Sequence, residues 1–202
     1  MSDEYDYQLK IILVGNSCTG KSSLCRQLIT KKFNVNQAQT IGVDFFSKTF
    51  EIVDKKYTKK IRYKTHIWDT AGQEVFNSLI TGYYKKSNGI LLVFDLNNNK
   101  SFSELEKWYN QISIHAPEYS SIMLIGNKCD LQQTVSDSDI DNFCKKYKIP
   151  YLITTSTDFR QTQNCFLELV KHIHNNTYIH NNVREIKQPL RINYSYSSGS
   201  CC

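Results

Sequence analysis

The sequence predicts an α/β fold in which helices cover both faces of a six-stranded, mostly parallel sheet. Three segments dominated by apolar runs, at residues 89–96, 121–130 and 149–156, are typical of strands that are buried on both faces. Segments with helical spacing of apolar residues separate them, at residues 101–116 and 136–149. Strands that alternate with such helices build a parallel sheet with right-handed crossovers, whose ligands gather at the carboxyl ends of the strands.

The first half of the chain supplies the other three strands. KIILV, at residues 10–14, is a short apolar strand, and it leads through a glycine loop into a helix that we expect to end near Lys32. Residues 40–53 have strand composition in their second half, and residues 61–68 form the hairpin partner across a long basic turn. Periodicity breaks around Gly72, after which a helical pattern resumes.

Three helices accompany the buried strands of the second half. Residues 101–116 and 136–149 each open with a serine N-cap and an acidic first turn, and residues 166–174 supply the last helix. From about Asn175 the chain has few large apolar residues and is rich in Asn, Ser and Tyr. We therefore expect one domain over residues 1–176, followed by a flexible tail.

Composition narrows the class of protein. The chain has 202 residues, of which 40% are hydrophobic and 22% charged, which suits one well-packed core. No apolar run approaches the roughly eighteen residues of a membrane-spanning helix, and the N-terminus is acidic and polar, so we expect neither a membrane span nor a signal peptide. The net charge of +6 is scattered, which argues against a nucleic-acid partner. Five of the seven cysteines are expected in the core or in loops.

The stretch GNSCTGKS, between the first strand and the first helix, predicts a phosphate site. Gly15 and Gly20 allow a tight turn whose N–H groups, with the helix N-terminus, surround anionic oxygens. Lys21 would place a positive charge on the β- and γ-phosphates and is a candidate catalytic residue, while Ser22 offers a hydroxyl ligand for Mg²⁺. The other expected nucleotide contacts here are Ser17, Cys18 and Thr19 of this stretch and Ser23, which follows it directly.

A second motif, DTAGQ, follows the strand at residues 61–68. Asp69 is placed to reach the Mg²⁺ shell, and Gly72 offers a backbone N–H to the terminal phosphate. Gln73 could orient a water in line with the γ-phosphate, so it is the second candidate catalytic residue. A third motif, NKCD, contains Asn127, Lys128 and Asp130. A carboxylate there can accept the two N–H groups that guanine presents and adenine lacks, which favours GTP over ATP.

Together, GNSCTGKS, DTAGQE and NKCD resemble a small GTPase of the Ras superfamily, which has a P-loop NTPase G domain. TIGVDF at residues 40–45, YYKKSNG at 83–89 and LVFDL at 92–96 are similar to stretches that mark the Rab branch. The resemblance covers about residues 7–175 and the last two positions. It implies that Thr40 coordinates Mg²⁺, that Phe33 packs against guanine, and that Ser156 and Thr157 shape the base pocket.

The same resemblance implies a GTP- and GDP-controlled switch in vesicle traffic, with slow hydrolysis completed by an activating protein's arginine. It also implies an exchange factor, a GDP-dissociation inhibitor or escort protein, and effectors that contact an aromatic patch of Phe45, Trp68 and Tyr83. Cys201 and Cys202 would accept two prenyl groups and hold the protein at the cytoplasmic face of intracellular membranes, from which it cycles through the cytosol. We expect a monomer.

Some residues depart from the family pattern. Cys18 occupies a position usually held by glycine, and Thr157 and Asp158 replace an Ala-Lys pair, although Thr157 keeps the backbone N–H that a guanine carbonyl needs. Val75 stands where an arginine is usual, and the hairpin turn at 54–60 is longer than typical. One alternative is therefore a GTP-binding interaction protein with negligible hydrolysis. Another, a P-loop small-molecule kinase, leaves NKCD, DTAGQE and the terminal cysteines unexplained.

Overall fold

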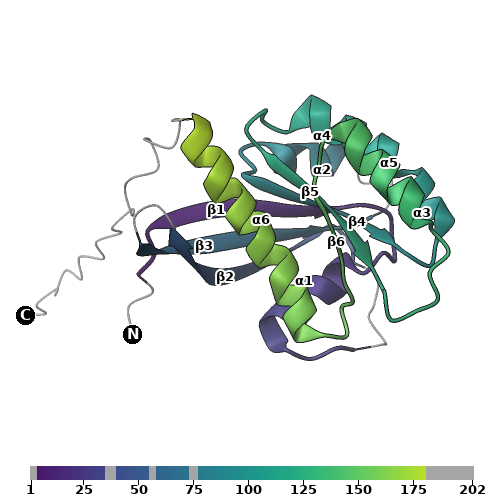
Figure 1. Ribbon diagram of the computed structural model, residues 1–202, viewed down its shortest axis with the longest axis horizontal. Coiled ribbons are helices and arrows are strands. Elements are labelled where there is room, and N and C mark those ends of the chain that lie inside the picture. The colour runs from purple at the N-terminus through teal and green to yellow at the C-terminus, as the bar shows by residue number, and fades with distance from the viewer. Residues whose placement is uncertain (1–3, 35–39, 55–57, 73–76, 181–202) are drawn as a thin grey trace, which may run out of the picture.

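A computed structural model describes residues 4–34, 40–54, 58–72 and 77–180 (Figure 1). In this part of the chain a six-stranded sheet has helices on both faces, in the strand order β2-β3-β1-β4-β5-β6. The elements in chain order are β1 (Tyr7–Val14), α1 (Lys21–Thr30), β2 (Val43–Asp54), β3 (Lys59–Thr70), α2 (Asn77–Tyr84), β4 (Gly89–Asp95), α3 (Asn99–Ser103), α4 (Leu105–His115), β5 (Ser121–Asn127), α5 (Asp137–Tyr147), β6 (Tyr151–Ile153) and α6 (Phe159–His180).

The sheet confirms the predicted fold class. β2 and β3 form the expected antiparallel hairpin, and the pairs β1–β3, β1–β4, β4–β5 and β5–β6 are all parallel. The carboxyl ends of β1, β3, β4, β5 and β6 consequently lie at one edge of the sheet. GNSCTGKS follows β1, and DTAGQ and NKCD begin in the last residues of β3 and β5, so the fold brings all three motifs to that edge.

Alternate side chains of the central strands enter two separate cores. Ile11 and Leu13 of β1 pack with α1 and α6 on one face, whereas Ile12 and Val14 pack on the opposite face with α4 and α5. Every residue of β4 is buried, as its continuous apolar run predicts. Figure 1 shows α6 crossing one face of the sheet, with α1 beside it.

The helix predicted at residues 101–116 is two helices, and its predicted cap was wrong. The Asn98 side chain caps α3 by accepting hydrogen bonds from the Lys100 and Ser101 backbone N–H groups. Ser101 is buried inside α3, where its hydroxyl donates to the Asp95 and Asn98 carbonyls. Asn98 lies three residues earlier and supplies the same kind of cap, which leaves Ser101 to fasten α3 to β4. The predicted Ser136 cap of α5 is confirmed, because its hydroxyl accepts the Asp139 N–H.

The last helix is much longer than predicted. It begins at Phe159, directly after Asp158, whose carboxylate accepts hydrogen bonds from the Arg160 and Gln161 N–H groups. It continues to His180, so the expected domain boundary at residue 176 falls inside it. Residues 181–202, with the terminal cysteine pair, lie outside the described residues. No helix in the described ranges combines the length and apolar character that crossing a membrane requires.

The five cysteines before the tail lie where the composition predicted. Cys25, Cys144 and Cys165 are buried in the core, while Cys18 and Cys129 are exposed in loops at the edge that carries the motifs. All five have free thiols. They therefore contribute packing and loop chemistry rather than cross-links.

Candidate functional site

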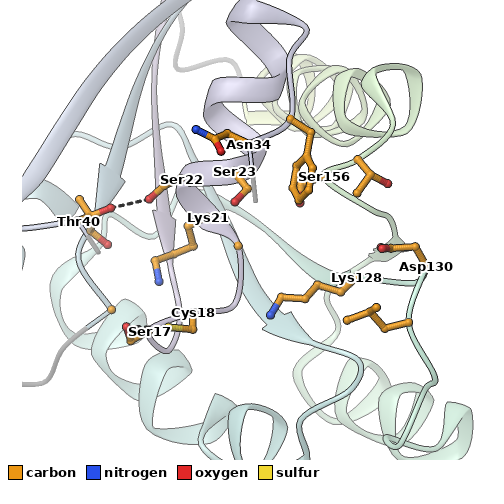
Figure 2. A pocket seen from close by; sticks show the side chains of 16 residues that line it. Ser17, Cys18, Lys21, Ser22, Ser23, Asn34, Thr40, Lys128, Asp130 and Ser156 are labelled. Carbon is orange, nitrogen blue, oxygen red and sulfur yellow. Dashed lines mark hydrogen bonds between the residues drawn. The ribbon is translucent and has the colours of Figure 1, made fainter. Parts of the chain in front are cut away.

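A cavity of about 470 Å³ opens at the carboxyl edge of the sheet. In Figure 2 the phosphate-loop side chains Ser17, Cys18 and Lys21 lie toward one end of it, and Lys128, Asp130 and Ser156 toward the other. The volume is typical of small-molecule sites. The lining residues are Ser17, Cys18, Gly20, Lys21, Ser22, Ser23, Phe33, Asn34, Thr40, Thr70, Gly72, Lys128, Asp130, Leu131, Ser156 and Thr157.

Two glycines of the phosphate loop are required by its geometry. Gly15 has φ 135°, and a Cβ there would lie 2.0 Å from the Val93 carbonyl oxygen. Gly20 has φ 93°, and its Cβ would lie 2.1 Å from the Asn127 side-chain nitrogen. Neither position has room for a side chain, so the loop can run close to β4 and to the NKCD motif.

Lys21 is held at the floor of the loop. Its ammonium donates to the carbonyls of Gly15 and Asn16, at 2.7 Å each, and the residue is only 5% exposed. Burial lowers the pKa of Lys21 to about 8, although the charge of Asp69 opposes this shift. An ammonium carries three N–H donors, so two carbonyls do not exhaust it. A bound phosphate would use the remaining donor and would also favour the charged form.

Cys18 adopts a backbone conformation that favours glycine. Its φ is 63°, in the left-handed region, and its thiol lies in the wall of the cavity. A side chain in that region costs about 1–2 kcal/mol. The departure noticed in the sequence therefore coincides with a strained residue of the phosphate loop.

Ser22, Thr40 and Asp69 come together as the sequence predicted. The Ser22 hydroxyl lies 2.6 Å from the Thr40 hydroxyl, the contact dashed in Figure 2, and donates to Asp69 Oδ2 at 2.5 Å. Asp69 is fully buried, and its Oδ1 accepts a hydrogen bond from none of the described residues. Burial raises the pKa of Asp69 to about 6, from an ordinary value of 3.8.

These three side chains fit a divalent cation. Hydroxyl and carboxylate oxygens are the ligands that Mg²⁺ prefers, usually together with several waters. The unsatisfied Asp69 oxygen is a buried acceptor to which a metal-bound water could donate. The donor set and this oxygen therefore suit Mg²⁺ held by Ser22 and Thr40, with Asp69 acting through a water.

Gly72 lies against the phosphate loop, where a side chain would collide with it. A Cβ at Gly72 would be 2.3 Å from the Ser17 backbone nitrogen and 2.4 Å from the Asn16 carbonyl carbon. The backbone after β3 can thus approach a phosphate bound in the loop. Gln73, the expected water-orienting residue, lies outside the described residues.

The NKCD motif lines the opposite end of the cavity. The buried Asn127 donates from its side chain to the Thr19 carbonyl at 2.8 Å, which ties this motif to the phosphate loop. Lys128 forms a 2.6 Å ion pair with Asp95 at the end of β4. Gly15, Thr19 and Asn127 are buried and do not line the cavity, while the other predicted nucleotide contacts that the structure describes do.

A short hydroxyl chain orients Asp130. The Thr155 hydroxyl donates to Asp130 Oδ1 at 2.5 Å, so it must accept from both the Thr157 hydroxyl, 2.8 Å away, and the Thr157 backbone N–H, 3.1 Å away. The N–H that was expected to meet a guanine carbonyl is therefore engaged with Thr155 in this structure. Sequence reasoning missed Thr155, although it stands directly before the recognised base-loop residue Ser156.

Other cavity residues also escaped the sequence analysis. Asn34 and Leu131 follow recognised residues, Phe33 and Asp130, and their positions were the only available signal. Thr70 lies within the DTAG motif, and its hydroxyl donates to the Leu13 carbonyl at 2.7 Å, which joins the ends of β3 and β1. Phe33 itself lines the cavity and is 42% exposed, so an aromatic face is available there.

Phe45, Trp68 and Tyr83 form a continuous row, called here the aromatic row. The ring centres of Phe45 and Trp68 lie 4.9 Å apart, and those of Trp68 and Tyr83 lie 5.2 Å apart. Phe45 is 50% exposed, and Lys10 places its ammonium near the Trp68 and Tyr83 rings. The three predicted patch residues, from β2, β3 and α2, are thus neighbours on the surface.

Comparisons with known proteins agree with this geometry. A model of the Ras family matches residues 10–175. GTP-binding protein ypt1 of Schizosaccharomyces pombe is 34% identical over 100% of both chains. Ras-related protein SEC4 of Candida albicans is 36% identical over 87% of this chain and 84% of its own, and GTP-binding protein YPT1 of Saccharomyces cerevisiae is 37% identical over 86% and 82%. With the family match and these identities over most of both chains, the protein belongs to the Ras family, as a Rab-type small GTPase.

Proposed function

We propose that this Rab-type GTPase binds GTP and GDP with Mg²⁺ in the cavity and acts as a nucleotide-controlled switch in vesicle traffic. The observation that carries the proposal is the placement of two complementary ends in one cavity. Lys21, Ser22 and Thr40 stand at the phosphate end, and Lys128 and Asp130 at the base end.

At the phosphate end the chain supplies charge and fixed donors. Lys21, held by two carbonyls, would meet the β- and γ-phosphates, and the N–H groups at the start of α1 would point toward the same oxygens. Ser22 and Thr40 would hold Mg²⁺, which would neutralise developing negative charge on the phosphates. Little covalent chemistry is then needed from the protein, because positioning and charge stabilisation dominate phosphoryl transfer.

At the base end Asp130 would select guanine. Its Oδ1 is committed to Thr155, which orients the carboxylate toward the cavity, where it would accept from two N–H groups of guanine. Phe33 would cover one face of the base, and Ser156 with Thr157 would close its edge. Adenine would leave the carboxylate unpaired, a loss that costs more than a missing contact.

Hydrolysis would transfer the γ-phosphoryl group to water, giving GDP and phosphate. Gln73 would orient that water, so Gln73→Leu should slow single-turnover GTP hydrolysis at least about tenfold while GTP still binds. The control is Gln111→Leu, the same substitution at a half-buried residue of α4 that does not line the cavity. Equal hydrolysis rates for the Gln73 variant and the wild type would instead favour a binding protein with negligible turnover.

The switch would arise from the two segments that border the phosphate. Thr40 precedes β2 and Gly72 follows β3, and both face the phosphate loop. A γ-phosphate would contact both, whereas GDP would leave these contacts unmade. The aromatic row starts on β2 and β3, so its shape would follow the nucleotide. Effectors would bind there, and exchange and activating proteins would act on the cavity.

Membrane attachment would come from the chain terminus. Cys201 and Cys202 would each carry a prenyl group, because one lipid chain alone binds a bilayer only marginally. The protein would then work at the cytoplasmic face of intracellular membranes and cycle through the cytosol with an escort protein. Changing both cysteines to serine should move the protein to the soluble fraction of its own cells. Unchanged recovery with membranes would contradict the lipid anchor but would leave the nucleotide site unaffected.

A further inference from the structure

The side chain of Asn16, in the phosphate loop, is held at both ends by residues distant in sequence, Glu104 between α3 and α4 and Trp108 in α4. Its Nδ2 donates to Glu104 Oε2 at 2.6 Å, and its Oδ1 accepts the indole N–H of Trp108 at 2.6 Å. An ionised carboxylate can only accept and an indole N–H can only donate, so these partners determine the orientation of the amide. We call the three side chains the Asn16 clamp.

The backbone of the same residue supports the groups that would contact phosphate. The Asn16 carbonyl accepts the Lys21 ammonium at 2.7 Å and the Thr19 hydroxyl at 3.0 Å. Gly72 packs on the peptide that joins Asn16 to Ser17. Asn16 therefore contacts Lys21, the rest of the phosphate loop and the chain at Gly72 after β3.

The Asn16 clamp can restrict movement of the peptide that joins Asn16 to Ser17. Trp108 is 6% exposed and the Glu104 side chain 18% exposed, so water competes weakly for either hydrogen bond. Hydrogen bonds to a charged partner are short and stronger than neutral ones. Because the Lys21 ammonium is almost fully desolvated, a displaced Asn16 carbonyl would leave it with one partner fewer.

We propose that Asn16 is a positioning residue for the nucleotide, and that Glu104 and Trp108 act through it to set where Lys21 meets the β-phosphate. This inference rests on the proposed nucleotide binding. It goes beyond the motif, because it assigns to nucleotide retention two residues, Glu104 and Trp108, that do not line the cavity themselves and reach it through Asn16.

The experiment uses the full chain loaded with a fluorescent GDP, whose release is followed at constant Mg²⁺ and pH 7.5. Asn16→Asp places two carboxylates in contact and should speed release by about tenfold or more, the scale of losing one hydrogen bond to a charged group. Glu104→Gln keeps an acceptor for Asn16 and should change release by no more than about threefold. The matched control is Glu106→Gln, two residues further along in the first turn of α4 and bonded instead to Lys146 and Tyr147.

The double variant provides the rescue. With Asn16→Asp and Glu104→Gln together, the glutamine amide donates to the new carboxylate, so the hydrogen bond is restored in the opposite direction. Release should return to within about threefold of wild type. Release that stays as fast as in Asn16→Asp alone would overturn the proposal, as would a wild-type rate for Asn16→Asp itself.

A second measurement separates positioning from general loosening of the fold. GMP keeps guanine and the α-phosphate but lacks the β-phosphate that Lys21 would contact. Asn16→Asp should therefore weaken GDP binding but change GMP binding, measured by competition, by less than about twofold. Equal losses for both nucleotides would refute the positioning role. If the wild type itself failed to bind GDP, the proposed function would fall and this inference with it.

Discussion

Asp69→Asn should make the nucleotide-free protein more stable while it weakens Mg²⁺ binding. The Asp69 carboxyl is fully buried, and among the described residues only Ser22 donates to it, at one of its two oxygens. At neutral pH and without a cation, the folded chain must therefore bury a poorly compensated negative charge. An asparagine has nearly the same shape, and its carbonyl can still accept the Ser22 hydrogen bond.

The magnitude follows from the pKa of Asp69. Burial raises that pKa from 3.8 to about 6, so the folded state binds the proton more tightly than the unfolded state. The stability from this group is complete below about pH 3.8 and is lost as the pH rises through about 6. At about 1.36 kcal/mol for each pH unit, the loss is about 3 kcal/mol at pH 7.5. Asparagine carries no charge and does not suffer this loss, so at pH 7.5 the free energy of unfolding of Asp69→Asn should exceed that of the wild type by up to about 3 kcal/mol.

Urea unfolding followed by tryptophan fluorescence, in EDTA and without nucleotide, measures this difference between pH 4 and 8. The stability advantage of Asp69→Asn should be largest above pH 7 and nearly absent at pH 4. With GDP and saturating Mg²⁺ the order should reverse, since the wild-type carboxylate then has a partner. Glu118→Gln, an exposed carboxylate-to-amide change, serves as the control. A variant that is less stable in EDTA at pH 7.5, or an advantage independent of pH, would refute the reasoning.

Three further predictions concern backbone geometry. Gly20→Ala should abolish fluorescent GDP binding, because its Cβ would lie 2.1 Å from the Asn127 amide nitrogen; Gly82→Ala, with no atom within 4 Å, should bind normally. Cys18→Gly should raise the thermal unfolding midpoint by relieving the left-handed conformation, a gain of about 1 kcal/mol, and a lower midpoint would contradict this. Asp158→Ala should cost about 1 kcal/mol of stability by removing the α6 cap, while Asp158→Asn should retain most of it.

Asp158 stands where the family pattern has a lysine, and the structure shows a local role for this departure. In the sequence Asp158 stood only as a departure from the family pattern beside the base-pocket residue Thr157. In the structure its carboxylate caps α6, which begins at the next residue. The early start of α6 was not predicted, because the expected helix was drawn from the apolar spacing of residues 166–174 alone. Caps depend on short polar side chains, which periodicity does not register.

The split between α3 and α4 has a similar cause. Both Asn98 and Ser101 are good N-cap residues, and local sequence cannot choose between them. Contacts with the end of β4 decide between them, because the Ser101 hydroxyl accepts the Asp95 N–H and donates to the Asp95 carbonyl. Ser101 therefore lies inside α3, where it fastens the helix to β4, and Asn98 provides the cap.

The sequence by itself determined which segments form strands and where helices separate them, the mostly parallel sheet and the three motifs at its edge. These features depend on residues close together in the chain: buried strands are continuous apolar runs, and GNSCTGKS, DTAGQE and NKCD are contiguous. Tertiary structure alone decided how the motifs engage one another. The bonds from Asn16 to Glu104 and Trp108 cross 88 and 92 residues, and the bond from Asn127 to Thr19 crosses 108. Such contacts exist only after the chain has folded, because no local preference encodes a partner that distant.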